Sequence, residues 1–198
     1  LAASGGGATS THDGLPHMFG ACIMGNMGYE SIELVELARP LIVWETAAVE
    51  DSGGAGQFRG AVGVRHRIQP VSHTMNLHYA GSGHTCAAFG LDPGANGKTA
   101  DHWIEDLESG QTTAKLKNAG KADVEPNQVW VAETGGGGGF GDPLDRETNA
   151  VLSDVASGFV SVDSARNIYG VVVEFADAAW HVNTDQTAKL RGARRQAP

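Results

Sequence analysis

Cysteine is scarce in this sequence. The 198 residues include two, Cys22 and Cys86, which lie far apart and form no C-x-x-C pair. Two cysteines are too few for the disulfide framework that stabilises small secreted domains. We therefore expect a reducing compartment, and in particular the cytoplasm.

Long apolar segments are also missing. No run approaches the roughly 20 apolar residues that cross a bilayer, and the N-terminus lacks the basic and apolar regions of a signal peptide. We therefore expect no contact with a membrane. The chain starts at Leu1 and enters a glycine-rich stretch at once, so we expect it to be a fragment of a longer protein.

Basic residues are too few for a protein that binds the phosphate backbone of nucleic acids. The sequence has 14 Lys and Arg against 23 Asp and Glu, a formal net charge of -9, and this balance opposes such binding. We therefore expect no nucleic-acid partner. A hydrophobic content of 41% over 198 residues is typical of a soluble globular protein with a single core.

Glycine, by contrast, is abundant, and it is concentrated where six of the seven residues from Gly135 to Gly141 are glycine. A flexible linker would be diluted with serine and would not contain Phe140. One interpretation is a loop whose N–H groups face an anionic intermediate, with Asp142 fixing the turn. The favoured interpretation is close packing against neighbouring strands or a partner subunit. The Lys and hydroxyl residue of a Walker A loop are missing, so we expect no nucleotide here.

Hydrophobic periodicity predicts an α+β protein: a β-rich body with irregular glycine-rich loops, followed by a short C-terminal helical pair. Expected strands cover residues 41–46, 62–68, 75–79, 103–104, 112–116, 124–131 and 171–175. Residues 32–37 could form a short helix or an irregular strand. The helical pair is expected between Thr148 and Gly170, with Ser161 as an N-cap. We treat residues 1–182 as one β-rich domain and residues 183–198 as a polar basic tail.

Three stretches, in this order, resemble the C-terminal part of the hydantoinase B/5-oxoprolinase family: residues 51–60, 135–146 and 158–172. Farther upstream, Asp13-Gly14 and residues 32–36 also match, so the resemblance covers roughly residues 4 to 175. The sequence departs from the family pattern at Ala61, where a second glycine is usual. It departs again at residues 29–31, where Tyr-Glu-Ser replaces Asn-Thr-Pro.

The resemblance implies ATP-dependent chemistry on cyclic amides such as hydantoin and 5-oxoproline, or on ketones such as acetone and acetophenone. An A-type, ATP-binding subunit phosphorylates the substrate, and the B-type subunit supports hydrolysis or carboxylation. Members hold a divalent metal with an H-x-N-D-P and G-G-x-H pattern, which this sequence does not contain. We therefore expect no metal or other cofactor on this chain. ATP with Mg, and Zn or Mn, are expected elsewhere in the complex, on the A-type subunit and the upstream part of the B-type subunit.

The catalytic residues cannot be identified from the sequence. Candidates for lining a substrate pocket are His17 in the N-terminal loop, Glu33 in the family-like segment and Asp142 after the glycine run. Asp51 and Arg59 could pair across a turn. The glycines to which we assign a structural role in loops are Gly53, Gly54, Gly56, Gly135, Gly136, Gly137, Gly138, Gly139 and Gly141.

The main hypothesis is that the chain takes part in catalysis as one part of a complex and is inactive alone. Two alternative functions compete with it. The first is a non-catalytic assembly subunit that buries its glycine-rich loop in an interface. The second is an independent metallohydrolase that uses histidines, since neutral imidazole is a common metal ligand. The histidines considered for such a site are His12, His17, His73, His78 and His84.

Overall fold

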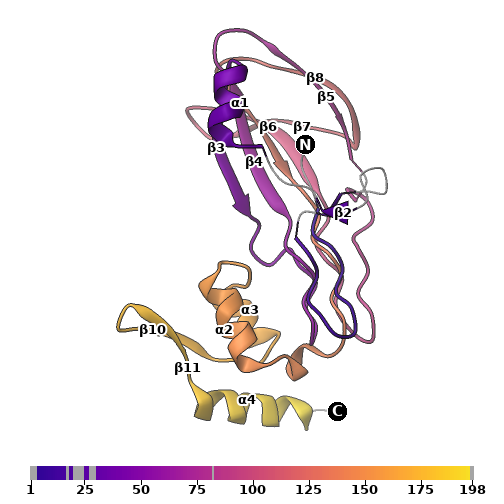
Figure 1. Ribbon diagram of the computed structural model, residues 1–198, viewed down its shortest axis with the longest axis vertical. Helices are drawn as coiled ribbons and strands as arrows, with labels where there is room; N and C mark the ends of the chain where they lie inside the picture. The colour runs from indigo at the N-terminus through magenta and orange to yellow at the C-terminus, as the bar shows by residue number, and fades with distance from the viewer. Residues whose placement is uncertain (1–3, 17, 20–24, 27–29, 82, 197–198) are drawn as a thin grey trace.

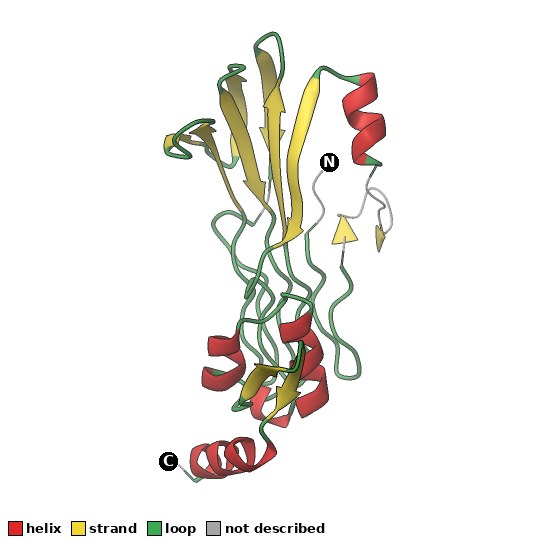
Figure 2. Cartoon of the chain, turned by 90° about the vertical axis from the view of Figure 1, so that its left-hand side faces the viewer, coloured by secondary structure: helices red, strands yellow, loops and turns green. Residues whose placement is uncertain are grey.

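A computed structural model describes residues 4–16, 18–19, 25–26, 30–81 and 83–196 of the chain. The molecule is elongated, with a β-sheet and helix α1 (Ile32–Ala38) at one end, the other helices at the opposite end and extended segments between them (Figures 1 and 2). The described residues form an α+β fold, which confirms the predicted fold class. Their helices include no segment long and apolar enough to cross a membrane.

The main sheet has five antiparallel strands in the order β3-β4-β9-β6-β7. These strands are β3 (Leu41–Ala48), β4 (Val64–Pro70), β9 (Gln128–Glu133), β6 (Asp101–Asp106) and β7 (Thr112–Lys115). A separate ribbon of β5 (Met75–Ala80) and β8 (Ala119–Val124) contributes to a core with the sheet. Leu77, Val124 and Ile104 are buried in this core, and Trp130 packs against them. A further short pair, β1 (Met18–Phe19) with β2 (Gly25–Asn26), lies near the N-terminus.

The second core lies at the helical end, where Val151, Val155, Ala165, Tyr169 and Val171 are buried together. The elements here are η2 (Pro143–Asp145), α2 (Thr148–Ala156), α3 (Val162–Asn167), the hairpin of β10 (Val173–Ala176) and β11 (Ala179–Val182), and α4 (Thr184–Arg195).

The boundaries of this helical pair follow the sequence signals. The side chain of Ser161 accepts a hydrogen bond from the N–H of Ser164 and caps α3. Gly158 follows the end of α2 with a φ of 70°, a conformation that favours glycine.

Two expectations about secondary structure were wrong. The strand expected at 124–131 starts only at Gln128, because Pro126 lies in the turn before it and cannot continue a ladder. Residues 119–123, where no strand was expected, form β8 together with Val124, and the exposed positions of this strand alternate with Ala122 and Val124.

Most of the residues treated as a polar basic tail form α4. Arg191 on this helix donates hydrogen bonds to the backbone oxygens of Tyr169 and Arg146.

Between the two cores, several extended segments surround the glycine run. The neighbouring segments lie at residues 5–8, 52–56, 60–61, 88–91 and 94–98. Figure 2 shows them as loops that run along the long axis of the molecule. We call this arrangement the glycine bundle.

The hydrogen bonds of the glycine bundle repeat every three residues. On one side, Gly5 N donates to Gly135 O at 3.0 Å and Ala8 N donates to Gly138 O at 2.8 Å. On another, the N–H groups of Gly136 and Gly139 donate to two carbonyls of the 94–98 segment, at 3.1 and 2.9 Å. A period of three is that of the polyproline II helix, which makes no internal hydrogen bonds and leaves its backbone groups for neighbours.

Because the run has neighbours on several sides, it has no room for side chains. A β-carbon on Gly136, Gly137 or Gly138 would lie 1.8, 1.9 or 2.0 Å from a backbone oxygen, each in a different neighbouring segment. Such contacts are far shorter than van der Waals distance. The bundle therefore requires glycine at these positions, because backbone approaches backbone directly.

This geometry predicts that Gly137→Ala destabilises the protein by about 3 kcal/mol or more, since a backbone oxygen cannot move aside as a flexible side chain can. The matched control is Gly7→Ala, whose β-carbon would lie 3.8 Å from Gly138 O, an ordinary contact. We expect this control to stay within about 0.5 kcal/mol of wild type. Urea unfolding of the three proteins measures both effects, and equal losses for the two variants would contradict the account.

Candidate functional site

Four charged side chains from four separate segments meet where the glycine bundle joins the helices. They are Asp13 of the N-terminal loop, Arg59 in the glycine-rich stretch 51–60, Arg146 after η2, and Asp154 of α2. Two arginines and two aspartates give a network without net charge. Three of these residues, Arg59, Arg146 and Asp154, are buried, whereas the side chain of Asp13 is 38% exposed.

Arg146 is the centre of this charged network. Its two terminal nitrogens donate to the two carboxylate oxygens of Asp13, each at 2.7 Å, in a bidentate pair. Its Nε donates to Asp154 Oδ2 at 3.1 Å, and Nη1 also donates to the backbone oxygen of Gln57 at 3.1 Å. Every guanidinium nitrogen thus faces an oxygen of the chain, so Arg146 is not free to bind a substrate anion.

Arg59 completes the network from the other side of Asp154. Its Nη2 donates to Asp154 Oδ1 at 3.1 Å, and its Nη1 donates to its neighbour's carbonyl, Gly60 O, at 2.6 Å. The guanidinium carbon lies 5.2 Å from the centre of the Phe159 ring, a cation–π contact. The backbone N–H of Arg59 donates to Asp13 Oδ1 at 2.7 Å. Both arginines and the N-terminal loop are thereby fixed to α2.

Two members of the network, Arg146 and Asp13, have pKa values that favour their charged forms. Burial by itself would lower the pKa of the Arg146 guanidinium, but Asp13 and Asp154 raise it above its ordinary value. Burial likewise opposes ionisation of Asp13, yet hydrogen bonds and charge from Arg146 and Arg59 keep the pKa of this carboxyl below its usual range.

A cleft of about 310 Å³ lies beside the network and has Asp13 and Arg146 in its wall. Other lining residues are Thr11, His12, Phe58 and Glu147. The side chain of His12 is exposed and its Nδ1 lies 2.8 Å from Thr11 Oγ1. Asp145, also in the wall, pairs with Arg195 of α4 at 2.5 Å. The cleft therefore offers acidic and apolar contacts rather than an anion site.

The glycine run directs its N–H groups into the chain. Five of them donate to carbonyl oxygens of neighbouring segments: Gly136 to Lys98, Gly137 to Ala61, Gly139 to Ala95, Phe140 to Phe58, and Gly141 to Leu91. These amides are occupied by backbone partners. The geometry is that of close packing and not that of a cradle for a phosphate.

The predicted pocket residues lie in different places. His17 falls outside the described residues. Glu33 is exposed on α1 (Ile32–Ala38), where it accepts a hydrogen bond from Ser31 Oγ at 2.5 Å. Asp142 caps η2 through a hydrogen bond from Leu144 N at 2.8 Å and lies three residues before Asp145 in the cleft wall. Helices α1 and α2 lie toward opposite ends of the molecule, so Glu33 is not brought to this cleft (Figure 1).

The predicted pairing of Asp51 with Arg59 was wrong. Arg59 turns to Asp154, and Asp51 Oδ1 instead accepts a hydrogen bond from Ser161 N at 3.0 Å, at the start of α3. Both residues fix the turn to the helical end and not to each other. Arg146 and Asp154 were missed, although Arg146 ends the family-like stretch and an arginine five residues after a glycine run is a signal that could have been used.

The described histidines do not converge on a common site. His12 lies in the N-terminal loop, His73 follows β4 and His78 is on β5. The His84 ring packs against that of His102, with centroids 4.4 Å apart, and burial together with the charge of His102 lowers the pKa of His84. Within the part of the chain that the structure describes, no group of three or more His, Cys, Asp or Glu residues is placed to hold a metal ion.

Comparisons with known proteins place this geometry in context. The family model for hydantoinase B/oxoprolinase matches residues 1–143. The chain is 34% identical over 178 residues to caprolactamase subunit beta of Pseudomonas jessenii, and this match covers 86% of this chain and 30% of that protein. The chain is 33% identical over 227 residues to the acetone carboxylase alpha subunit of Xanthobacter autotrophicus, and this match covers 96% of this chain and 29% of that protein.

Solved structures show the same likeness. The nucleotide-free structure of an acetone carboxylase, from work on ATP-dependent acetone carboxylation, superimposes with a TM-score of 0.77 at 28% identity. The match covers 98% of this chain and 30% of that one. The chain thus spans about 30% of the length of the relatives it matches.

The charged network predicts that Arg146→Met costs about 3–5 kcal/mol, because Asp13 loses its bidentate partner and the buried Asp154 keeps only Arg59. Arg195→Met is the matched control, since the side chains of Arg195 and Asp145 are 56% and 53% exposed. An exposed pair of this kind contributes at most about 1 kcal/mol. Chemical denaturation compares the two variants, and an Arg146→Met variant as stable as Arg195→Met would contradict the assignment.

The lowered pKa of Asp13 also predicts a pH dependence. A carboxyl whose native pKa lies below its unfolded value of about 3.9 contributes stability above that value and loses it as the pH falls through the native pKa. The difference in unfolding free energy between wild type and Asp13→Asn should therefore be constant above about pH 5 and shrink below about pH 4. Denaturant titrations across this range measure it. A difference that grows toward acid pH would contradict the sign.

Proposed function

The chain belongs to the hydantoinase B/oxoprolinase family, and we propose that it forms part of a B-type subunit in an ATP-dependent enzyme. The enzyme hydrolyses cyclic amides or carboxylates ketones. Support comes from relatives of both kinds, a caprolactamase subunit and an acetone carboxylase subunit, at similar identity of 34% and 33%. This similarity does not favour one reaction over the other.

Within that enzyme, the chain contributes architecture. The observation that carries this role is that the guanidinium of Arg146 and five of the seven N–H groups of residues 135–141, which lie in one of the family-like stretches, are bonded to the chain itself. A group whose donors are all engaged in the folded state cannot stabilise a transition state without breaking the fold. These contacts hold the two cores in place.

The proposal assigns the chemistry to other parts of the complex. An A-type subunit supplies ATP with Mg, and the upstream part of the B-type subunit supplies a divalent metal, Zn or Mn. The cleft beside Asp13 is where this chain can form a wall of the substrate pocket, with Asp142 holding the turn that leads into it. The complex acts in the cytoplasm, and the isolated chain is inactive.

A second candidate function is a purely structural subunit of the same complex. It is favoured by the occupied donors described above and by the absence of a metal-binding cluster among the described residues. It differs from the first candidate in one respect, which is whether the cleft contacts substrate. An independent metallohydrolase would instead require the purified chain to contain stoichiometric zinc or manganese.

Reconstitution tests the proposal. We expect ATP hydrolysis that depends on hydantoin, 5-oxoproline, caprolactam or a ketone only when the chain is combined with an A-type subunit and the upstream part of a B-type subunit. Turnover by the isolated chain would contradict it. Asp142→Ala, which removes the cap of η2, separates the two candidates: intact assembly with lost turnover indicates a pocket, and lost assembly indicates a scaffold.

A further inference from the structure

Helix α1 is an apolar helix that buries none of its side chains. Leu34 and Leu37 are 57% and 84% exposed, and Ile32 is 38% exposed. The helix has a capping serine, Ser31, and only seven residues. A helix this short depends on packing against other elements for its stability. The exposed leucines of α1 do not provide such packing within the described residues.

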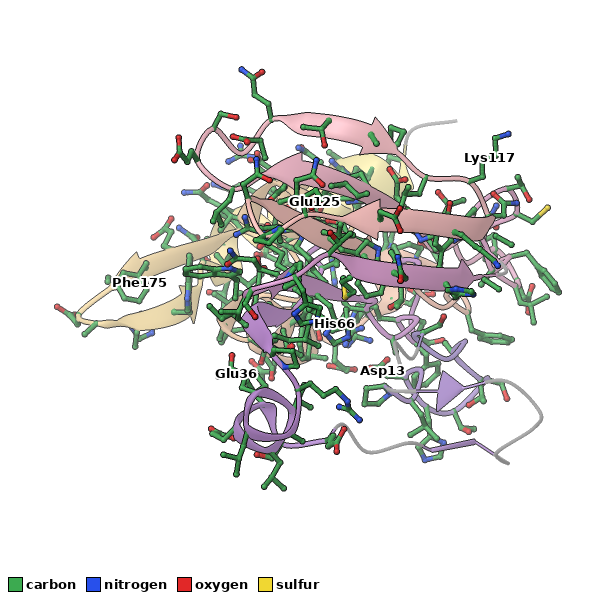
Figure 3. All side chains as sticks on the ribbon, turned by 90° about the horizontal axis from the view of Figure 1, so that it is seen from above. Asp13, Glu36, His66, Lys117, Glu125 and Phe175 are labelled. Carbon is green, nitrogen blue, oxygen red and sulfur yellow. The ribbon has the colours of Figure 1, made fainter. Side chains whose placement is uncertain are left out.

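The leucines face away from the sheet. Glu36 Oε1 accepts a hydrogen bond from the N–H of Val43 on β3 at 2.8 Å, which fixes one side of the helix against the edge of the sheet. At about 100° per residue, Leu34 lies roughly 160° and Leu37 roughly 100° around the helix from Glu36, so neither leucine points to the side that Glu36 fixes. Figure 3 shows α1, with Glu36 labelled, standing clear of the strands with side chains on its outer side.

Further apolar side chains are exposed on the part of the sheet next to α1. Trp44 lies at the bulge of β3 and is 54% exposed, and Val71, 49% exposed, donates its N–H to Pro40 O, which follows the helix. Among the eleven large hydrophobic side chains that are exposed in the described residues, four are Leu34, Leu37, Trp44 and Val71, and we call these four the α1 face. Ile32 is not included, because it precedes Glu36 by four residues and lies on the same side of the helix.

Strand β3 adds a second reason for a partner at this edge. It is an edge strand of eight residues, whereas the opposite edge strand, β7, has four and carries Lys115. Proteins shorten, charge or cover such edges, because long unpaired strands bind other chains. Glu36 accepts a hydrogen bond from one N–H of β3, and no strand among the described residues pairs with β3 at this edge.

We propose that the remainder of a B-type subunit packs on the α1 face. This inference rests on the proposed function. The chain matches about 30% of caprolactamase subunit beta and 29% of the acetone carboxylase alpha subunit. In proteins of that length, more than two thirds of the subunit lies outside the matched part and must pack against it. The α1 face supplies the apolar surface for this contact.

The charges around the α1 face argue against a second copy of the chain. Glu33 and Glu36 are exposed on the helix, and Glu30 before it is paired with Arg39 at 3.3 Å. In a symmetric dimer the same acidic rim would face itself. The surface fits a partner with an apolar centre and Lys or Arg at its rim, since opposite charges favour association and like charges oppose it.

Binding to the rest of a B-type subunit tests the inference. The probe is caprolactamase subunit beta of Pseudomonas jessenii from which the 178 matching residues have been removed, and binding to the 198-residue chain is measured by biolayer interferometry. We expect wild type to bind and the double variant Leu34→Ser/Leu37→Ser to bind roughly tenfold or more weakly. The control is Phe89→Ser, which removes a side chain that is 74% exposed beside the glycine bundle.

Several results would overturn the inference. They are no binding by wild type, equal weakening by Phe89→Ser, or a dimer of the wild-type chain in sedimentation that the double variant abolishes. Circular dichroism melting checks that the double variant keeps its fold, as expected for exposed positions. Binding through the α1 face without ATP-dependent turnover in the reconstituted complex would instead contradict the proposed function and leave the docking surface in place.

Discussion

Direct contact between backbones in the glycine bundle is the constraint on which the rest of the structure depends. Gly136, Gly137 and Gly138 approach three neighbouring segments so closely that a β-carbon would meet a carbonyl oxygen within 2.0 Å. Because the run uses a period of three, its hydrogen-bonding groups point to several sides and bind segments that are far apart in the sequence. The sheet and the helical end are connected through these segments, so each core is positioned by the bundle.

The charged network closes the bundle at its helical end. Arg146 follows the glycine run by five residues from Gly141 and meets Asp13, which is 133 residues away in sequence, and Asp154 on α2. Breaking one partner of a buried network leaves a charge without compensation, which is costly. The bundle fixes where these four side chains meet, and the network in turn fixes α2 to the bundle. In the proposed function, this connection determines how the cleft and the α1 face are oriented toward the rest of a B-type subunit.

Part of this could be predicted from the sequence. The glycine run signalled close backbone contact, because an aromatic residue and no serine accompany it, and the caps at Ser161 and Gly158 signalled the helical pair. The partners in the network could not be predicted, since composition and periodicity report local structure and not which distant segments meet. The polar strand β8 was missed for a similar reason: Lys121 and Asp123 are tolerated on its exposed side because β5 supplies the hydrogen bonds.

Hydrogen exchange measured by NMR on the isolated chain tests the central claim most directly. The account holds that the amides of Gly136, Gly137 and Gly139 are bonded within the fold and are not held ready for a ligand. It therefore predicts that they exchange only through opening with a free energy close to that of global unfolding, with no change when inorganic phosphate is added. Rapid exchange of these amides, or a shift of their resonances on addition of phosphate, would contradict it.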